Sequence, residues 1–269
     1  MQSLFDVKKE ICEIGKRVHS NGYVAANDGN ISVKINQNEF LCTPTGVSKG
    51  FMTPDMIIKV DGKGNKIEGD LNPSSEMKMH LKVYAERPDV NAVVHAHPPT
   101  ATGFAIAGIP LDMYTMPEAI IFLGTVPIAE YGTPSTDEIP DSLAPYIHNH
   151  DAFLLQNHGA LTVGNTLTKA FFMMENLEFF AKASFIARQL GGENELSCEQ
   201  IEKLMIIRDN FKVPGKHPGF DKKAYEKRVA QKSTSKNGCS FYECPFCSGK
   251  MDIETLTDKI AEKVIEKIK

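Results

Sequence analysis

NAVVHAHPP, residues 91–99, is the stretch of the chain that decides its fold. Its β-branched content is typical of a buried strand, and Pro98 and Pro99 end it because proline lacks the N–H that a sheet ladder needs. A helical pattern precedes it at 74–86, and a shorter one follows at 100–107. A strand between two helices indicates an α/β protein.

The same alternation continues outward in both directions. Apolar spacing and turn residues predict helices over 4–19, 135–148, 166–190 and 198–211, a hairpin over 31–43, a strand over 55–60, and two short strands within 151–164. We therefore predict one α/β domain over residues 1–213, in which helices cover a central sheet.

Composition excludes several classes of partner. The formal net charge is −4 and the pI is about 6.1, so there is no general electrostatic reason to bind nucleic acid or anionic lipid. Charged residues interrupt every apolar run near the N-terminus, and no later stretch approaches the roughly 20 apolar residues of a membrane span. Cys12, Cys42 and Cys198 are scattered, as expected of reduced thiols. We predict a cytoplasmic protein without membrane segments.

Two histidines in the decisive stretch suggest a metal site. His95 and His97 are two residues apart in a predicted strand, so both imidazoles leave the same face. His158, at a strand–turn junction before Gly159, is the best third ligand for a cation such as Zn²⁺ with an open position. From spacing alone, polar core or surface histidines remain an alternative. The remaining histidines, at 19, 80, 148, 150 and 217, lack a comparable setting.

Acidic and small polar residues suggest a second part of the site. Ser74 or Ser75 can cap the helix that runs to Glu86, and Glu76 opens that helix either as a further cap or as a base beside the metal. Three turns expose hydroxyl and backbone N–H groups that could bind a phosphate: residues 28–30, 43–46 and 74–75. Each of them alone is an ordinary turn.

Five motifs in order carry a family resemblance: GNIS (29–32), TPTG (43–46), PSSE (73–76), VVHAHPP (93–99) and QNHGAL (156–161). Over about residues 1–210 the chain resembles the class II aldolase and epimerase family. That resemblance implies a central mixed or antiparallel sheet covered by helices. It also implies a homotetramer with active sites between subunits.

The resemblance also implies roles for single residues. His95, His97 and His158 would bind zinc, with Glu76 as a fourth, displaceable ligand. The substrate phosphate would be held by Asn30, Thr45, Gly46, Ser74 and Ser75. Tyr114, four residues past Pro110, would match a tyrosine that is donated across a subunit interface.

The implied reaction is cleavage of a carbon–carbon bond in a sugar phosphate. The motifs are nearest to the family branch that splits L-fuculose 1-phosphate, or a similar deoxyketose 1-phosphate, into dihydroxyacetone phosphate and lactaldehyde. L-ribulose-5-phosphate 4-epimerase, rhamnulose-1-phosphate aldolase and methylthioribulose-phosphate dehydratase activities remain alternatives. Epimerases of the family tend to carry Asp where this chain has Glu76, which favours the aldolase. A catalytically silent scaffold or binding subunit is the alternative outside enzymes.

The chain continues beyond the resemblance. Residues 214–250 are polar and lysine-rich, as in a solvated linker. They contain Cys239, Cys244 and Cys247, one cysteine short of a structural zinc site, and we interpret these as linker cysteines. Residues 251–269 form one apolar stripe at helical spacing: Ile253, Leu256, Ile260, Val264 and Ile268.

That last segment resembles the encapsulation peptides of bacterial microcompartments. The resemblance implies a location inside such a compartment and a shell protein or cargo helix as the partner of residues 251–269. A helix that docks back on its own oligomer is the alternative.

Overall fold

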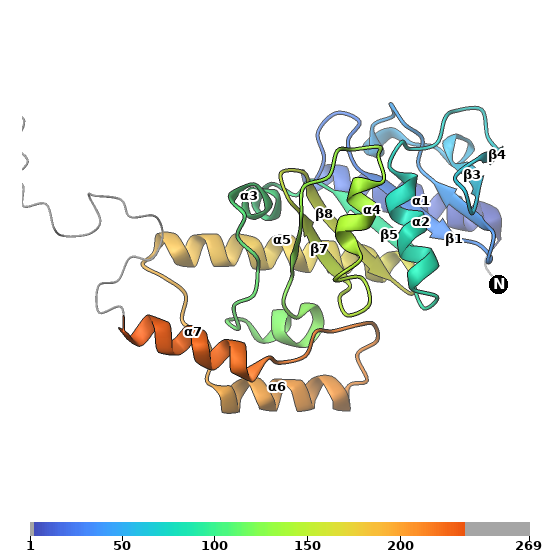
Figure 1. The fold of residues 1–269 in the computed structure, drawn as a ribbon. Coiled ribbons are helices and arrows are strands. Elements are labelled where there is room, and N and C mark those ends of the chain that lie inside the picture. Colours follow the sequence, from blue (N-terminus) through green and yellow to red (C-terminus); the bar gives the residue numbers. More distant parts are fainter. Residues whose placement is uncertain (1–2, 235–269) are drawn as a thin grey trace, which may run out of the picture. The chain divides into compact units, whose positions relative to one another are not determined.

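The structure of the protein is a computed structural model that describes residues 3–234 (Figure 1). Residues up to Phe220 form one compact unit, and a second unit begins at Asp221. Within the predicted linker, Lys222–Thr234 forms the helix α7. The three linker cysteines and the predicted segment 251–269 lie outside the described residues, and the domain boundaries at 213 and 250 remain predictions.

A single mixed sheet forms the centre of the first unit. Its eight strands lie in the order β4-β3-β2-β1-β5-β8-β7-β6. The strands are β1 Asn30–Lys34, β2 Glu39–Cys42, β3 Ile58–Asp61, β4 Lys66–Glu68, β5 Ala92–Ala96, β6 Ile128–Ala129, β7 Ala152–Leu155 and β8 Gly159–Gly164. Every neighbouring pair is antiparallel except β6–β7, which is parallel. The predicted fold class is confirmed.

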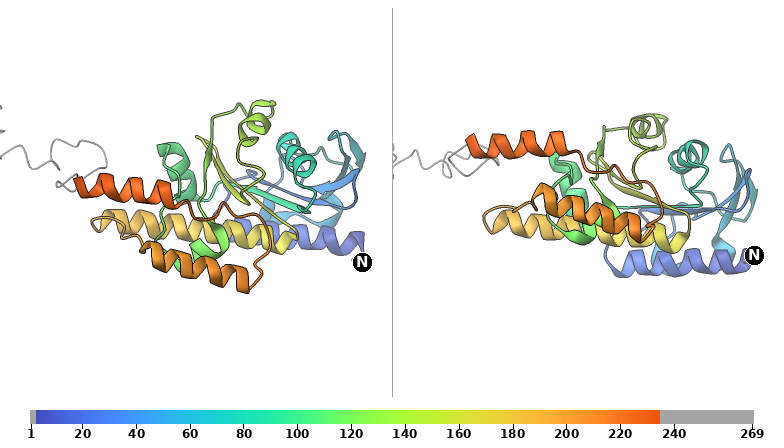
Figure 2. Two further views of the ribbon diagram at one scale, coloured as in Figure 1. Left: turned by 60° about the horizontal axis from the view of Figure 1, so that its bottom comes forward. Right: turned by 90° about the horizontal axis from the view of Figure 1, so that it is seen from below.

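Helices cover both faces of this sheet (Figures 1 and 2). The α-helices of this unit are α1 Leu4–Ser20, α2 Met77–Glu86, α3 Pro99–Ala107, α4 Glu138–Leu143, α5 Leu167–Gln189 and α6 Cys198–Asn210. It also contains two short 3₁₀-helices, η1 Lys49–Phe51 and η2 Pro54–Met56, and a π-helix, η3 Ala119–Leu123. One apolar core joins the sheet to α1, α3 and α5, and a second joins it to α2 and α4. Among residues 3–234, no helix combines the length and the apolar character that a membrane crossing requires.

The alternation of side chains along β5 divides these two cores. Ala92, Val94 and Ala96 belong to the core under α1, α3 and α5, whereas Val93 belongs to the core under α2 and α4. His95 therefore leaves the sheet on the same face as Val93. The α2 face of the sheet is thus the face on which the predicted metal site must lie.

Several element boundaries differ from the prediction. Helix α2 begins at Met77 without a side-chain cap, so the predicted caps Ser74 and Ser75 are wrong. The predicted helix over 135–148 is shortened to α4, because Pro145 lacks the N–H that would continue it. The π-helix η3 was not predicted, since AIIFL shows no helical periodicity of its own.

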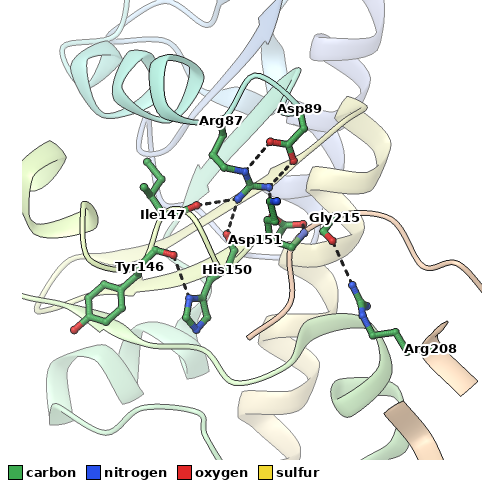
Figure 3. Close-up of polar contacts among 9 residues, drawn as sticks. Arg87, Asp89, Tyr146, Ile147, His150, Asp151, Arg208 and Gly215 are labelled. Carbon is green, nitrogen blue, oxygen red and sulfur yellow. Dashed lines mark hydrogen bonds and ion pairs between the residues drawn. The ribbon is translucent and has the colours of Figure 1, made fainter. Parts of the chain in front are cut away.

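One buried arginine fastens the end of α2 to later parts of the chain (Figure 3). Arg87 is 2% exposed and donates to both oxygens of Asp89, to Asp151 Oδ1 at 2.7 Å, and to the carbonyls of Ile147 and His150. Asp151 Oδ2 in turn accepts from the backbone N–H of Lys216 at 2.9 Å. The segment after residue 213 is therefore attached to the sheet unit, which accounts for that unit extending to Phe220.

Candidate active site

Sheet register brings three histidines together. Strands β5 and β8 are antiparallel, with Ala96 opposite Ala160, so the end of β5 meets the turn before β8. The ligand atoms of His95, His97 and His158 all lie within 4.8 Å of one another. The Nε2 atoms of His95 and His97 are 3.2 Å apart. Residues separated by more than 60 positions therefore form one cluster.

Glycine at position 159 makes this approach feasible. A Cβ atom on Gly159 would lie 2.5 Å from Cδ2 of His97 and 2.6 Å from the carbonyl oxygen of Ala96. The preceding Asn157 has a φ of 56°, in the left-handed region that asparagine tolerates. The QNHG turn thus delivers His158 while it leaves room for His97.

Glu76 lies against the same cluster. Its Oε2 is 3.4 Å from His95 Nε2, and its Oε1 is 3.3 Å from His158 Nε2. Asn30 donates from Nδ2 to Glu76 Oε2 at 2.7 Å. The sequence left two roles open for Glu76, a cap of α2 or a group beside the metal. Its side chain makes no capping bond to α2, so the position beside the histidines is the one observed.

Two of the three imidazoles, those of His95 and His97, are neutral near pH 7. His95 is fully buried and donates from Nδ1 to the carbonyl of Ala160 at 2.9 Å, which directs the lone pair of Nε2 to the centre of the cluster. Burial, and then the neighbouring His158 and His97, hold the pKa of His95 well below its ordinary value. Burial also lowers the pKa of His97. Neutral imidazole is the form that binds metal ions.

The residues fit a divalent cation. Buried Glu76 Oε1 and Asn30 Oδ1 have no hydrogen-bond partner within residues 3–234. Neighbouring nitrogen ligands on one tetrahedral zinc ion are typically about 3.3 Å apart, close to the separation of the two Nε2 atoms. Three imidazoles with one carboxylate in reach form a donor set that suits such an ion and leaves a position for substrate.

The loops predicted to hold a phosphate lie side by side. The backbone N–H of Thr45 donates to Asn72, and that of Ser74 donates to Thr43, at 3.0 and 3.2 Å. A bridge between Pro44 and Pro73 completes this junction. Thr45, Gly46 and Ser75 are exposed, and Ser74 is half-buried. Asn30, also predicted for this role, lies directly opposite His95 in the β1–β5 register and joins this region to the histidines.

Tyr114 makes its contacts with a different segment. Its backbone N–H donates to Glu195, and its carbonyl accepts from Leu196. Its ring is buried and meets Phe220 edge-on, with centroids 5.0 Å apart. Its predicted role at a subunit interface stays a prediction.

Three residues near the centre were not predicted to lie beside the histidines, although Asp28 belongs to the predicted turn 28–30. Asp28 Oδ2 lies 3.7 Å from His97 Nδ1. His80, one helical turn after Glu76, is fully buried and bonds through Nδ1 to Ser32 Oγ at 2.7 Å, and burial lowers its pKa to about 3. Lys49 is buried, and burial lowers the pKa of its ammonium group, while the charges of Asp28 and Glu76 act to raise it. Because Glu76 and His80 are four residues apart, helical spacing could have predicted that both face the site. Nothing in the sequence indicates that Lys49 lies near it.

Comparison with known proteins agrees with this arrangement. The model of the class II aldolase and adducin N-terminal domain matches residues 9–185. An L-fuculose phosphate aldolase of Methanococcus vannielii is 38% identical over 178 residues, which are 66% of this chain and 95% of that protein. A 5-deoxy-D-ribulose 1-phosphate aldolase of Bacillus thuringiensis is 32% identical, with coverages of 73% and 92%. A 3-oxo-tetronate 4-phosphate decarboxylase of Escherichia coli is 33% identical, with coverages of 67% and 86%.

Solved structures agree as well. An L-fuculose 1-phosphate aldolase superposes with a TM-score of 0.70 at 32% identity, over 77% of this chain and 96% of that one. Class II aldolases depend on a divalent metal, and the three histidines are placed to hold one. The chain belongs to the class II aldolase family and is an aldolase of the lyase class.

Proposed function

We propose that the protein cleaves L-fuculose 1-phosphate, or a similar deoxyketose 1-phosphate, into dihydroxyacetone phosphate and lactaldehyde with the help of a zinc ion. One observation carries this proposal. The carboxylate of Glu76 lies within 3.4 Å of His95 and His158, two members of the histidine cluster, next to loops rich in hydroxyl and N–H groups.

His95, His97 and His158 would hold the ion, with Glu76 as a displaceable fourth ligand. When bound, a divalent cation supplies Lewis acidity that stabilises the negative charge left on the substrate after a carbon–carbon bond next to a carbonyl breaks. Thr45, Gly46, Ser74, Ser75 and Asn30 would hold the phosphate and so fix the sugar chain relative to the histidines.

Two residues would move protons. Glu76, partly withdrawn from water, would transfer the proton at the carbon that loses its bond. Tyr114 of a neighbouring subunit would take the proton from the hydroxyl whose carbon becomes the aldehyde. This role requires an oligomer in which Tyr114 lies next to the site of a neighbouring subunit, and we propose a homotetramer with active sites between subunits. Within its own chain the ring of Tyr114 packs on Phe220.

The test is a substrate panel on the purified protein, with metal analysis of the same sample. L-fuculose 1-phosphate, L-rhamnulose 1-phosphate, 5-deoxyribulose 1-phosphate and L-ribulose 5-phosphate are supplied in turn, and released dihydroxyacetone phosphate is trapped by a coupled reductase. We expect the highest kcat/KM for L-fuculose 1-phosphate and about one zinc per chain. Epimerisation of L-ribulose 5-phosphate without triose release would overturn the proposal.

The relatives motivate a second candidate reaction. Because the decarboxylase of Escherichia coli is nearly as similar as the aldolases, decarboxylation of a 3-oxo sugar-acid phosphate is the competing activity. Release of carbon dioxide from that substrate at a higher kcat/KM than cleavage of any ketose 1-phosphate would favour it.

For the location, we propose that residues 251–269 are an encapsulation peptide and that the cytoplasmic enzyme is carried into a microcompartment. The apolar stripe of that segment supports this proposal. Residues 251–269 fused to a fluorescent protein should give foci in a compartment-forming cell. A diffuse signal there, with the shell intact, would contradict targeting.

A further inference from the structure

A buried lysine joins two of the loops around the site. Lys49 is 1% exposed, and its Nζ donates to the carbonyl of Asn27 at 2.8 Å and to that of Val47 at 2.7 Å. The first carbonyl belongs to the turn that leads into Asn30. The second follows directly on Thr45 and Gly46. One ammonium group therefore ties together two segments that both contribute predicted phosphate-binding groups.

The backbone of Lys49 is itself held in place by α1. A Cβ atom on Gly15 would lie 2.7 Å from the carbonyl oxygen of Lys49 and 2.5 Å from the end of the Met52 side chain. The helix can therefore lie directly on η1 only because residue 15 is glycine. Since its main chain is fixed in this way, the side chain of Lys49 has a defined starting point.

Among the described residues, no carboxylate is in direct contact with the ammonium of Lys49. An ammonium offers three donors, and the two carbonyls use two of them. Within residues 3–234, no carboxylate oxygen lies within 4.0 Å of Nζ. Burial lowers the pKa of Lys49 to about 8, while the charges of Asp28 and Glu76 act to raise it. A buried cation without an ion partner costs free energy, which a nearby bound anion offsets.

We propose that Lys49 is a positioning residue of the phosphate site, which holds the Asn30 and Thr45–Gly46 segments at a set separation and favours an anion between them. This inference rests on the proposed function, because that function supplies the phosphate. Lys49 acts through the loops and is not in contact with the substrate.

The test compares Lys49→Met and Lys49→Arg with Lys59→Met. Lys59 is a matched control because it is also mostly buried, with 16% of its side chain exposed, but pairs with Glu68 on β4. Inorganic phosphate is titrated into each full-length, metal-loaded protein by calorimetry. We expect Lys49→Met to weaken phosphate binding at least tenfold, Lys49→Arg to weaken it less, and Lys59→Met to leave it unchanged. Equal affinities in Lys49→Met and the unmodified protein would overturn the inference.

Kinetics separate positioning from general loss of structure. For Lys49→Met we expect KM for L-fuculose 1-phosphate to rise at least tenfold, with kcat changed less than threefold and kcat/KM for unphosphorylated L-fuculose nearly unchanged. If Lys49 only stabilised the fold, Lys49→Met would lower kcat/KM for both sugars by the same factor. That result would contradict the proposal. If Lys49→Met fails to fold by circular dichroism, Lys49→Gln replaces it, and equal phosphate affinity in Lys49→Gln and Lys49→Arg would be the contradicting result.

The same measurements distinguish the two proposals. If the unmodified protein neither binds inorganic phosphate nor cleaves a sugar phosphate, the proposed function fails and the role of Lys49 fails with it. If the unmodified protein does both and Lys49→Met behaves identically, only the role of Lys49 is wrong.

Discussion

Asn30 Nδ2 donates a hydrogen bond of 2.7 Å to Glu76 Oε2. This bond joins the first residue of β1 to the residue before α2, across 46 positions of the sequence. The sequence predicted Asn30 for the phosphate and Glu76 for the metal or a proton. Their contact means that Asn30 also orients the carboxylate, because both groups are largely buried and Glu76 has few other donors to choose from.

Asn30→Ala should therefore lower activity through Glu76. The buried oxygen of Glu76 would lose its donor, so we expect kcat to fall about tenfold and the free energy of unfolding to fall by about 1–2 kcal/mol. Stopped-flow assays and urea unfolding measure the two effects. Asn91→Ala is the control, since Asn91 makes an exposed bond of 3.2 Å to the carbonyl of Asn165. Unchanged kcat in Asn30→Ala would show that the bond does not orient the base.

Glu76→Gln should separate metal binding from proton transfer. Three histidines remain, so we expect the metal content to stay above half of the normal value, while kcat falls by about 10²–10⁴-fold. Metal content is measured by mass spectrometry and kcat by trapping of the triose product. Glu175→Gln serves as the control, because Glu175 pairs with Arg17 on α1. Near-normal turnover in a metal-loaded Glu76→Gln protein would remove Glu76 from the mechanism.

The sequence predicted which helices and strands hold the site more accurately than it predicted where these elements begin and end. The strand over 91–97 and the paired strands within 151–164 are confirmed, because a short apolar run bounded by turn residues or proline is too short for a helix. The start of α2 was wrong. Ser74 donates its backbone N–H to Thr43, so the chain at this point forms a loop junction before it enters the helix.

The surroundings of the histidines could not be predicted. Asp28 and Lys49 reach the site through the paths of two loops, and no periodicity encodes where loops meet. The resemblance to the family supplied the histidines and Glu76 because those residues lie in short, ordered motifs. It did not supply the tie that Lys49 makes between carbonyl groups, since backbone acceptors leave no mark on residue identity.

Gly159→Ala should damage the histidine cluster directly. The new methyl group would lie 2.6 Å from the carbonyl oxygen of Ala96, which is fixed in the sheet, and against the ring of His97. We expect a loss of about 1–3 kcal/mol in stability and at least a tenfold weaker affinity for the metal. Chelator competition and thermal unfolding measure both.

Gly103→Ala is the matched control for that substitution. Gly103 lies within α3, and a Cβ atom there would meet nothing within 4 Å. Alanine should therefore stabilise the protein by about 0.5–1 kcal/mol and leave the metal affinity unchanged. If both glycine variants behave alike, the steric account of the QNHG turn is wrong.

His217 should make the stability of the protein depend on pH. It donates from Nε2 to the carbonyl of Ile120 at 2.8 Å and accepts at Nδ1 from the N–H of Gly219 at 3.0 Å, an arrangement that requires the neutral ring. Burial, and then the charge of Arg208, lower its pKa from the ordinary 6.5 to about 4. Between these two values the unfolded chain binds a proton that the folded chain does not. His217 therefore contributes stability above pH 6.5 that is lost as the pH falls towards 4, at up to about 1.4 kcal/mol per pH unit.

His217→Gln tests this dependence. At pH 7 the variant should be less stable by about 1–2 kcal/mol, because one or both hydrogen bonds are lost. As the pH is lowered from 7 to 4.5 the difference should shrink, since only the unmodified protein has to keep a histidine neutral at this position. Urea unfolding of both proteins with a chelator present isolates the effect from proton uptake linked to metal loss. Parallel stability curves over this range would show that the ring at position 217 is not held in its neutral form by the fold.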